Sequence, residues 1–279
     1  MRALPLVLAG LLFALARAAL PAGEPWGPGP TEGRPWHPAE LGPEEGPGTP
    51  AAVALAAAAG KRRALVGATA AEVPALREAA VAAALGVVQG FPDEPEAVEA
   101  AFRAGELRRA GGDPAAALAH FRRAAELGRG TALGARARYE AGHVLRREGR
   151  WSEALTVYER VHHDGAATAA RRDLAGLWLA RARVELGQDD EAERLLRRLV
   201  DDAVDPVTRV RVYDLLIERV VARGDLAAAA GWLDACKASV HAESVEETRR
   251  GRRVRAALED LRGLELLRAA IASQVGVPR

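Results

Sequence analysis

Three consecutive side chains, His162-His163-Asp164, are the clearest candidate for metal chemistry in this 279-residue chain. Zinc requires three or four ligands that converge on one point. Adjacent residues of a helix point about 100° apart, so neighbouring histidines do not share a face. The sequence contains no second cluster that would complete the site. We therefore predict a solvated helix end here and no bound metal.

The serine and cysteine residues do not form a recognisable nucleophilic site. Ser152, Ser239, Ser244 and Ser273 all lie outside any G-x-S-x-G elbow. Ser152 follows a turn glycine, where a helix N-cap is wanted. Cys236 is the single cysteine; it falls on a helix packing position and should behave as a small buried hydrophobe. With no phosphate-binding loop or dinucleotide fingerprint either, we predict a protein that is not an enzyme and binds no cofactor.

A basic run near the C-terminus has the charge to contact phosphates or anionic lipid. It is bracketed by acidic residues, some of them three or four positions away, which favours a solvated helix with its own salt bridges. The chain as a whole is balanced, with 39 basic and 38 acidic residues, so no global field attracts a polyanion. We therefore predict no nucleic-acid partner. The run consists of Arg249, Arg250, Arg252, Arg253 and Arg255, and its acidic neighbours are Glu243, Glu246, Glu247, Glu259 and Asp260.

A sequence repeat indicates which helices would position a functional site. Gly112, Gly149, Gly187 and Gly224 each begin a short tract of small and polar residues that precedes an Ala-containing apolar segment. Their separations are 37, 38 and 37 residues (149−112, 187−149, 224−187). A fixed period in this range indicates stacked supersecondary units, which offer an extended surface more readily than an enclosed catalytic pocket.

Helical spacing of the apolar residues divides each unit into two helices joined by a glycine turn. A last helix without a partner would cover the final apolar edge. Two Ala-rich helices precede the repeats at 51–59 and 73–88, with a joint over 60–70. The predicted pairs are 96–110 with 114–127, 133–148 with 152–162, 167–186 with 189–201, and 206–223 with 226–240, and the last helix is 246–272.

The residues at equivalent positions of these pairs resemble the tetratricopeptide repeat family. In that family the first helix carries a small residue where the second crosses it closely; here these positions are Gly105, Gly142, Ala180 and Ile217. The second helix carries alanine at Ala117, Ala154, Ala192 and Ala229, and a large apolar residue at Phe121, Tyr158, Leu196 and Leu233. Ile217 is larger than the family pattern, so the fourth pair is expected to be irregular. The resemblance implies an all-α, right-handed solenoid of helical hairpins.

The first fifty residues have the composition of a targeting signal followed by a linker. A basic start, an apolar run over 3–16 and the small residues Ala16 and Ala18 around Arg17 are typical of a secretory signal peptide. Residues 21–50 hold nine of the sixteen prolines, which favours a disordered linker. We expect cleavage and an exported, periplasmic or extracytoplasmic protein; an uncleaved N-terminal anchor is the alternative. Trp26 and Trp36 are either docking points or incidental.

The predicted organisation is a signal peptide at 1–18, a Pro/Gly-rich disordered linker at 19–50, N-terminal helices with a possible degenerate repeat at 51–95, four repeats at 96–241, and a capping helix and tail at 242–279. The joint Phe91-Pro92-Asp93-Glu94-Pro95 is similar to that of exported, envelope-associated members of the family. The resemblance implies a scaffold for protein–protein interactions in the bacterial cell envelope. The alternatives are an accessory subunit of an envelope enzyme and a module that binds peptidoglycan or a small ligand.

The first helix of each pair lines the inner face of such repeats, and its exposed positions define a candidate groove. The groove is rich in arginine with two aromatic residues beside it. Arginine pairs with carboxylates and aromatic rings anchor extended peptides, so we predict an acidic peptide segment as the ligand; a merely solvated face is the alternative. The candidate residues are Phe102, Glu106, Arg109, Arg136, Tyr139, His143, Arg146, Arg147, Arg181 and Arg211.

Overall fold

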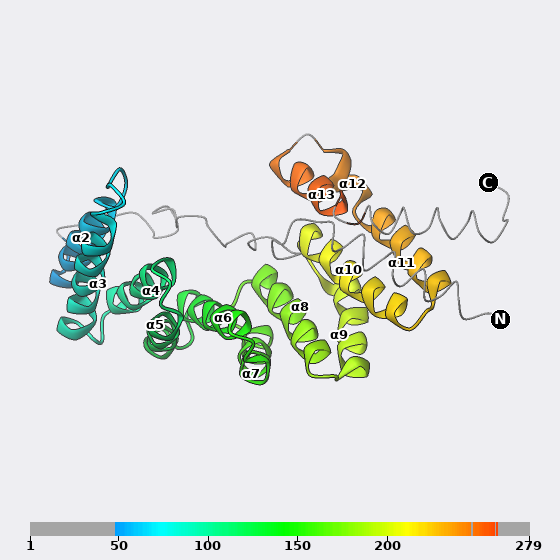
Figure 1. The fold of residues 1–279 in the computed structure, drawn as a ribbon, viewed down its shortest axis with the longest axis horizontal. Helices are drawn as coiled ribbons and strands as arrows, with labels where there is room; N and C mark the ends of the chain where they lie inside the picture. Colours follow the sequence, from blue (N-terminus) through cyan, green and yellow to red (C-terminus); the bar gives the residue numbers. More distant parts are fainter. Residues whose placement is uncertain (1–47, 247, 260, 262–279) are drawn as a thin grey trace. The chain divides into compact units, whose positions relative to one another are not determined.

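A computed structural model describes residues 48–246, 248–259 and 261, and within these residues the chain forms twelve helices and no strand (Figure 1). The predicted signal peptide, the linker up to residue 47 with Trp26 and Trp36, and the chain after residue 261 lie outside the described residues. The described chain divides between Leu186 and Gly187 into two compact units, here called the N-terminal unit and the C-terminal unit.

The N-terminal unit is a succession of helical hairpins, in which each helix packs on the next. Alternate helices α2, α4, α6 and α8 also contact one another in turn and so form one layer. The other layer consists of α3, α5 and α7. The helices are α2 (Pro50–Arg63), α3 (Val73–Gly90), α4 (Pro95–Ala110), α5 (Pro114–Leu127), α6 (Ala132–Arg147), α7 (Trp151–His162) and α8 (Ala169–Glu185).

The C-terminal unit is centred on α10, which packs against α9, α11 and α13. Its apolar core joins the aliphatic residues of α10 to Leu233 and Cys236 of α11 and to Val254 of α13. The unit consists of α9 (Asp189–Asp202), α10 (Pro206–Ala222), α11 (Leu226–Ser239), α12 (His241–Val245) and α13 (Arg249–Glu259).

The four repeat glycines all adopt the left-handed backbone conformation that a tight turn between helices requires. Their φ angles are 77° at Gly112, 69° at Gly149, 73° at Gly187 and 79° at Gly224. A residue with a Cβ atom is strained in this region, and this explains the choice of glycine. The same backbone device therefore recurs at the interval found in the sequence.

The small and large repeat positions meet inside the hairpins. A Cβ atom added to Gly105 would lie 2.7 Å from the ring of Phe121, and one added to Gly142 would lie 2.8 Å from the ring of Tyr158. Each ring therefore occupies the space that the missing side chain leaves, as the sequence predicted. The other repeat positions, Ala117, Ala154, Ala180, Ala192, Leu196, Ala229 and Leu233, are buried as well.

Several local expectations differ from the structure. Ser152 is not an N-cap: α7 begins at Trp151, one residue earlier, and its N-cap is Arg150, without a side-chain cap bond. Helix α2 runs on to Arg63 through the joint expected to begin at residue 60. The single helix expected from residue 246 starts later, because the extended backbone at Glu246 separates α12 from α13.

The boundary between the two units falls within the third predicted pair, between α8 and α9. In the fourth pair, the large Ile217 is fully buried and belongs to the same apolar cluster as Leu233. That pair thus accommodates a bulky residue at a position where the family is small.

Candidate peptide-binding face

The two aromatic residues predicted to be exposed in the groove are buried. Phe102 and Tyr139 are each 1% exposed. Their rings turn into the hairpins and meet the rings of the following helices, with centroids 5.4 Å apart for Phe102 and Phe121 and 6.0 Å apart for Tyr139 and Tyr158. Because ring–ring packing beside a glycine removes more apolar area from water than a surface position would, these residues support the face and do not form its surface.

Arginine side chains cover these rings. The guanidinium of Arg136 lies 4.7 Å from the ring centroid of Phe102, and that of Arg171 lies 5.5 Å from the ring of Tyr139. Arg146 lies 4.2 Å from the ring of Trp178. Cation–π contacts of this kind hold a planar guanidinium in a fixed orientation. The surface of the predicted groove is therefore made of arginines stacked on a buried aromatic layer.

Glutamates lie among these arginines on α4 and α6. Arg103 donates to Glu106 at 2.6 Å and contacts Glu99 at 3.4 Å. Arg109 of α4 donates to Glu140 of α6 at 2.8 Å, and Arg136 approaches Glu106 at 4.0 Å. The two pairs of Arg103 lie within α4, and the pairs of Arg109 and Arg136 join α4 to α6 of the same layer. All four fix the positions of their guanidinium groups.

The pKa of the buried Glu140 is affected both by burial and by the arginines around it. Its side chain is 2% exposed, and burial raises the pKa of its carboxyl against the opposing effect of Arg109, Arg136 and Arg171. Burial likewise raises the pKa of Glu99, with Arg103 acting in the opposite direction. Both acids are thus held in surroundings that disfavour an uncompensated negative charge.

His143 was predicted to line the groove, but it is 1% exposed and lies inside the aromatic layer. Its Nδ1 atom and the hydroxyl of Tyr158 lie at a hydrogen-bond distance of 3.1 Å. Burial lowers the pKa of His143 well below 6.5, and the positive charges of Arg146, Arg109, Arg147 and Arg171 lower it further. The histidine therefore serves as a neutral packing residue beneath a positively charged surface.

We call the surface of α4, α6 and α8 that carries these charges the arginine face. It belongs to the N-terminal unit alone. Its acids are fewer than its arginines, so its net charge is positive. The face is defined by Arg109, Arg136, Arg146, Arg147, Arg171 and Glu106, and it includes the largely buried side chains of Arg103, Glu99 and Glu140 that pair among them.

The structure brings together most of the predicted groove residues, although in different roles. Glu106, Arg109, Arg136, Arg146 and Arg147 contribute to the arginine face. Phe102, Tyr139 and His143 lie beneath it. Arg181 is on α8 and pairs with Glu185 at 2.8 Å. Arg211 is on α10 and belongs to the C-terminal unit.

Sequence reasoning missed several members of the face. Arg103 lies two positions before the close-packed Gly105, where the repeat pattern does not predict exposure, and in the structure it is 7% exposed. Its spacing from Glu99 and Glu106, four and three residues, would have indicated an ion-pair network. Arg171 and Trp178 lie on α8, where the position equivalent to Tyr139 is Leu177; the repeat pattern therefore did not point to an aromatic residue there.

The other chemical candidates have structural partners in the described chain. His162 Nδ1 lies 2.9 Å from the backbone oxygen of Arg172, and Asp164 accepts from Arg138 at 2.5 Å. No group of three metal-ligating side chains occurs in the part of the chain that the structure describes. Cys236 is fully buried, and burial raises the pKa of its thiol to about 12, so it is not a reactive thiolate.

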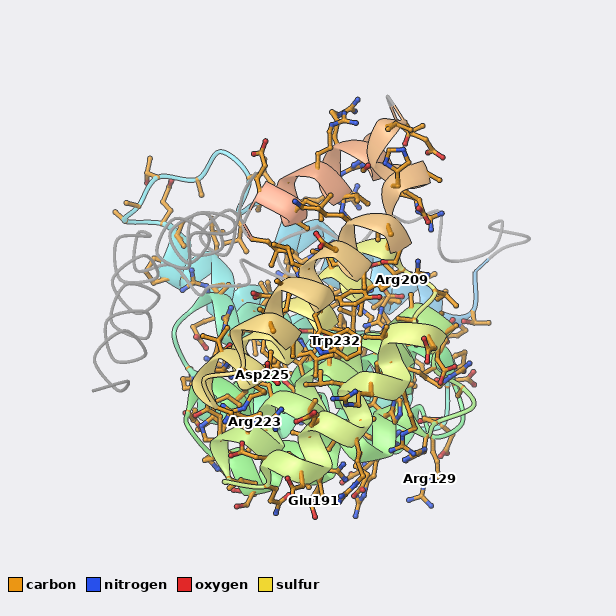
Figure 2. All side chains as sticks on the ribbon, turned by 90° about the vertical axis from the view of Figure 1, so that its right-hand side faces the viewer. Arg129, Glu191, Arg209, Arg223, Asp225 and Trp232 are labelled. Carbon is orange, nitrogen blue, oxygen red and sulfur yellow. The ribbon has the colours of Figure 1, made fainter. Side chains whose placement is uncertain are left out.

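In the C-terminal unit, arginines mainly tie loops and helices together. Arg209 donates to the backbone oxygens of Ala203, at 2.7 Å, and Ser239, at 3.0 Å, so it links the loop before α10 to the end of α11 (Figure 2). The guanidinium of Arg197 lies 5.2 Å from the ring of Trp232. Arg223, at the end of α10, pairs with Glu193 of α9.

Comparison with known proteins agrees with the repeat architecture. Residues 145–216 match the family described as Tetratricopeptide repeat. The chain is built from tetratricopeptide-like helical hairpins. The all-α hairpin fold predicted from the sequence is thereby confirmed. No curated protein sequence matches the chain.

Solved structures share the fold at low sequence identity. MamA residues 41-end from Desulfovibrio magneticus RS-1 is 20% identical with a TM-score of 0.51, covering 72% of this chain and 99% of its own. A MamA RS-1 double mutant is 20% identical with a TM-score of 0.52 and covers 71% and 99%. A Podosopora anserina protein of kinesin-light-chain type with nearly identical TPR-like repeats is 16% identical, with a TM-score of 0.50 and coverage of 70% and 96%.

Among the helices that the structure describes, none is both long enough and apolar enough to span a membrane.

Proposed function

We propose that this protein is a non-catalytic scaffold whose arginine face holds an acidic segment of a partner protein. The observation that carries the proposal is the gathering of arginines from three helices around α6. Arg109 of α4 donates to Glu140 at 2.8 Å, Arg171 of α8 lies 5.5 Å from the ring of Tyr139, and Arg136 of α6 lies 4.7 Å from the ring of Phe102. The same three arginines oppose the rise in the pKa of Glu140 that burial causes. Charges gathered from three neighbouring helices in this way suit an extended anionic ligand.

The mode of support also favours a binding surface. Arg136, Arg146 and Arg171 each lie over a ring, so less side-chain entropy remains to be lost when a ligand binds. A guanidinium presents several N–H donors in a plane and suits carboxylates better than a flexible ammonium does. The ligand that fits is an extended peptide with carboxylates spaced along it.

The proposed place of action is outside the cytoplasm. It rests on residues 1–18, whose basic start, apolar run and small residues at the expected cut have the pattern of an exported protein. Determination of the mature N-terminus tests this part by itself. A mature chain that begins at Ala19 supports export with cleavage, and one that retains Met1 contradicts cleavage.

Binding of a fluorescein-labelled short peptide of alternating glutamate and serine tests the arginine face. In fluorescence anisotropy, the double variant Arg136→Glu with Arg146→Glu should weaken binding by at least about tenfold, because two favourable charge contacts become repulsive. The matched control is Arg129→Glu with Arg160→Glu, which makes the same charge change at two exposed positions outside the face. The control should stay within about twofold of the unmodified protein.

A conservative pair separates the loss of charge from the loss of structure. Arg136→Lys with Arg146→Lys keeps both charges but removes the planar fork, and should weaken binding less than the glutamate pair does. Thermal unfolding of all the variants shows whether the fold is retained. Equal affinity in the glutamate pair and the control pair, with both folded, would overturn the proposal.

A further inference from the structure

The basic run at residues 249–255 does not form the set of salt bridges that its sequence predicts. Arg249, Arg250 and Arg253 form no ion pair with any residue in the described chain. The acidic residues that precede them in the described chain do not pair with these three arginines either. Glu246 accepts a hydrogen bond from Thr248 at 3.2 Å, and no salt bridge joins Glu243 to these arginines. The acids Glu247 and Asp260 lie outside the described residues.

The arginines of this run also oppose the local electrostatics of α13. Helix α13 begins at Arg249, and no acidic residue lies in its first turn. The N-terminus of a helix carries a partial positive charge, so arginines are unfavourable in this first turn. Arg249, Arg250 and Arg253 break this local rule without an ion pair in the described chain to offset it, and such surface residues are candidates for function.

Contacts with the rest of the unit fix the orientation of α13 and therefore of its exposed arginines. Gly251 and Val254 are buried on the side that faces the rest of the unit, and a Cβ atom on Gly251 would lie 2.0 Å from the backbone oxygen of Glu246. Arg255 donates to the backbone oxygens of Ser244 at 2.7 Å and Glu246 at 3.0 Å. One arginine of the five is therefore used to hold α13 in place.

The other four arginines are exposed. At about 100° per residue they span an arc of about 160°, and they rise about 6 Å along the axis of α13. We call Arg249, Arg250, Arg252 and Arg253 the α13 row. It is a compact, convex and positively charged surface, held rigidly by Gly251, Val254 and Arg255.

We propose that the α13 row binds the phosphate headgroups of an anionic phospholipid membrane. A convex row of guanidinium groups fits a flat anionic surface, and clusters of about four to eight basic residues on a helix are typical of surfaces that bind anionic lipid headgroups. Within α13, the apolar residues Val254, Ala257 and Leu258 pack against the core of the unit, so attachment is electrostatic and needs no insertion. The row also lacks the aromatic residues on which single-stranded nucleic acid stacks, and the predicted export favours a membrane as the polyanion.

Vesicle co-sedimentation of the chain from Ala19 onward, which retains every described residue, tests the proposal. Vesicles of phosphatidylcholine with about 30% phosphatidylglycerol should bind the protein at low salt and release it at about 0.5 M salt. Pure phosphatidylcholine vesicles should not bind it. The variant Arg250→Glu with Arg253→Glu should partition at least about thirtyfold more weakly, since each arginine at an anionic surface contributes about fivefold and the glutamates add repulsion.

The matched control is Arg194→Glu with Arg198→Glu, which places the same charge change on exposed residues of α9 in the same unit. It should partition within about threefold of the unmodified chain. Equal loss in both variants, equal binding to neutral vesicles or no binding at low salt would each overturn the proposal. Tighter binding to a short DNA duplex than to the anionic vesicles, with the same dependence on Arg250 and Arg253, would overturn it in favour of nucleic acid.

Discussion

The hairpin of α6 and α7 and the hairpin of α10 and α11 use equivalent positions in opposite ways. The first has Gly142 against Tyr158, with the buried His143 beside them. The second has Ile217 and Leu233 in an aliphatic cluster. Glycine lets a ring and a polar network enter the hairpin, and arginines then stack above that layer. In the second hairpin an aliphatic pair fills the same space, and the ring of Trp232, on which Arg197 stacks, is not a member of that pair.

Because each hairpin is packed around its own pair, opposite changes of size should destabilise both. The larger effect is expected for Ile217→Ala, which leaves a cavity in a fully buried site and should lower the free energy of unfolding by about 3 kcal/mol. Chemical denaturation measures this loss. Val245→Ala, at a residue that is 64% exposed in the same unit, should change stability by less than about 0.5 kcal/mol. A tolerated Ile217→Ala would show that the family's small residue suits this hairpin after all.

The reverse change, Gly142→Leu, should lower the free energy of unfolding by about 2 kcal/mol. Its Cβ atom alone would lie 2.8 Å from the ring of Tyr158, which is fully buried and cannot move aside. Gly86→Leu is the matched control, because a Cβ atom on Gly86 of α3 meets nothing within 4 Å. Leucine is the better helix former, so the control should be neutral or slightly stabilising. Similar melting curves for the two variants would contradict the assigned contact.

The buried histidine gives the N-terminal unit a pH dependence of stability on the acid side of neutrality. The pKa of His143 is lowered well below 6.5 by burial and then by the nearby arginines. A lowered pKa means that the neutral form stabilises the fold above pH 6.5, and that this stability is lost as the pH falls below 6.5 toward the folded pKa.

The variant His143→Gln tests this. In the unmodified protein the free energy of unfolding should rise with pH below pH 6.5, with a slope that approaches about 1.4 kcal/mol per pH unit, and the variant should lack this rise. Glu140 and His120 titrate in both proteins: the raised pKa of Glu140 acts in the opposite direction, and the lowered pKa of His120 acts in the same direction. The difference between the two proteins therefore isolates His143. His241→Gln, at an exposed residue of the C-terminal unit, should keep the slope. If the free energy of unfolding of His143→Gln depends on pH as that of the unmodified protein does, a group other than His143 causes the dependence.

These comparisons also show what the sequence could predict. The turn glycines and the pairs Gly105 with Phe121 and Gly142 with Tyr158 follow from spacing, because a left-handed turn and a close helix crossing each restrict residue type locally. The burial of Phe102 and Tyr139 did not follow, because it depends on ring packing between helices and on arginines supplied by the next hairpin. The division into two units between Leu186 and Gly187 did not follow either, since the spacing of 38 residues across that region resembles the other intervals.

The most direct test of the central claim is hydrogen–deuterium exchange of the protein with and without the saturating acidic peptide. The account predicts slower exchange in α4, α6 and α8, where the arginine face lies, and unchanged exchange in α10 and α11. Protection confined to the C-terminal unit, or no protection at peptide concentrations that saturate the anisotropy signal, would contradict it.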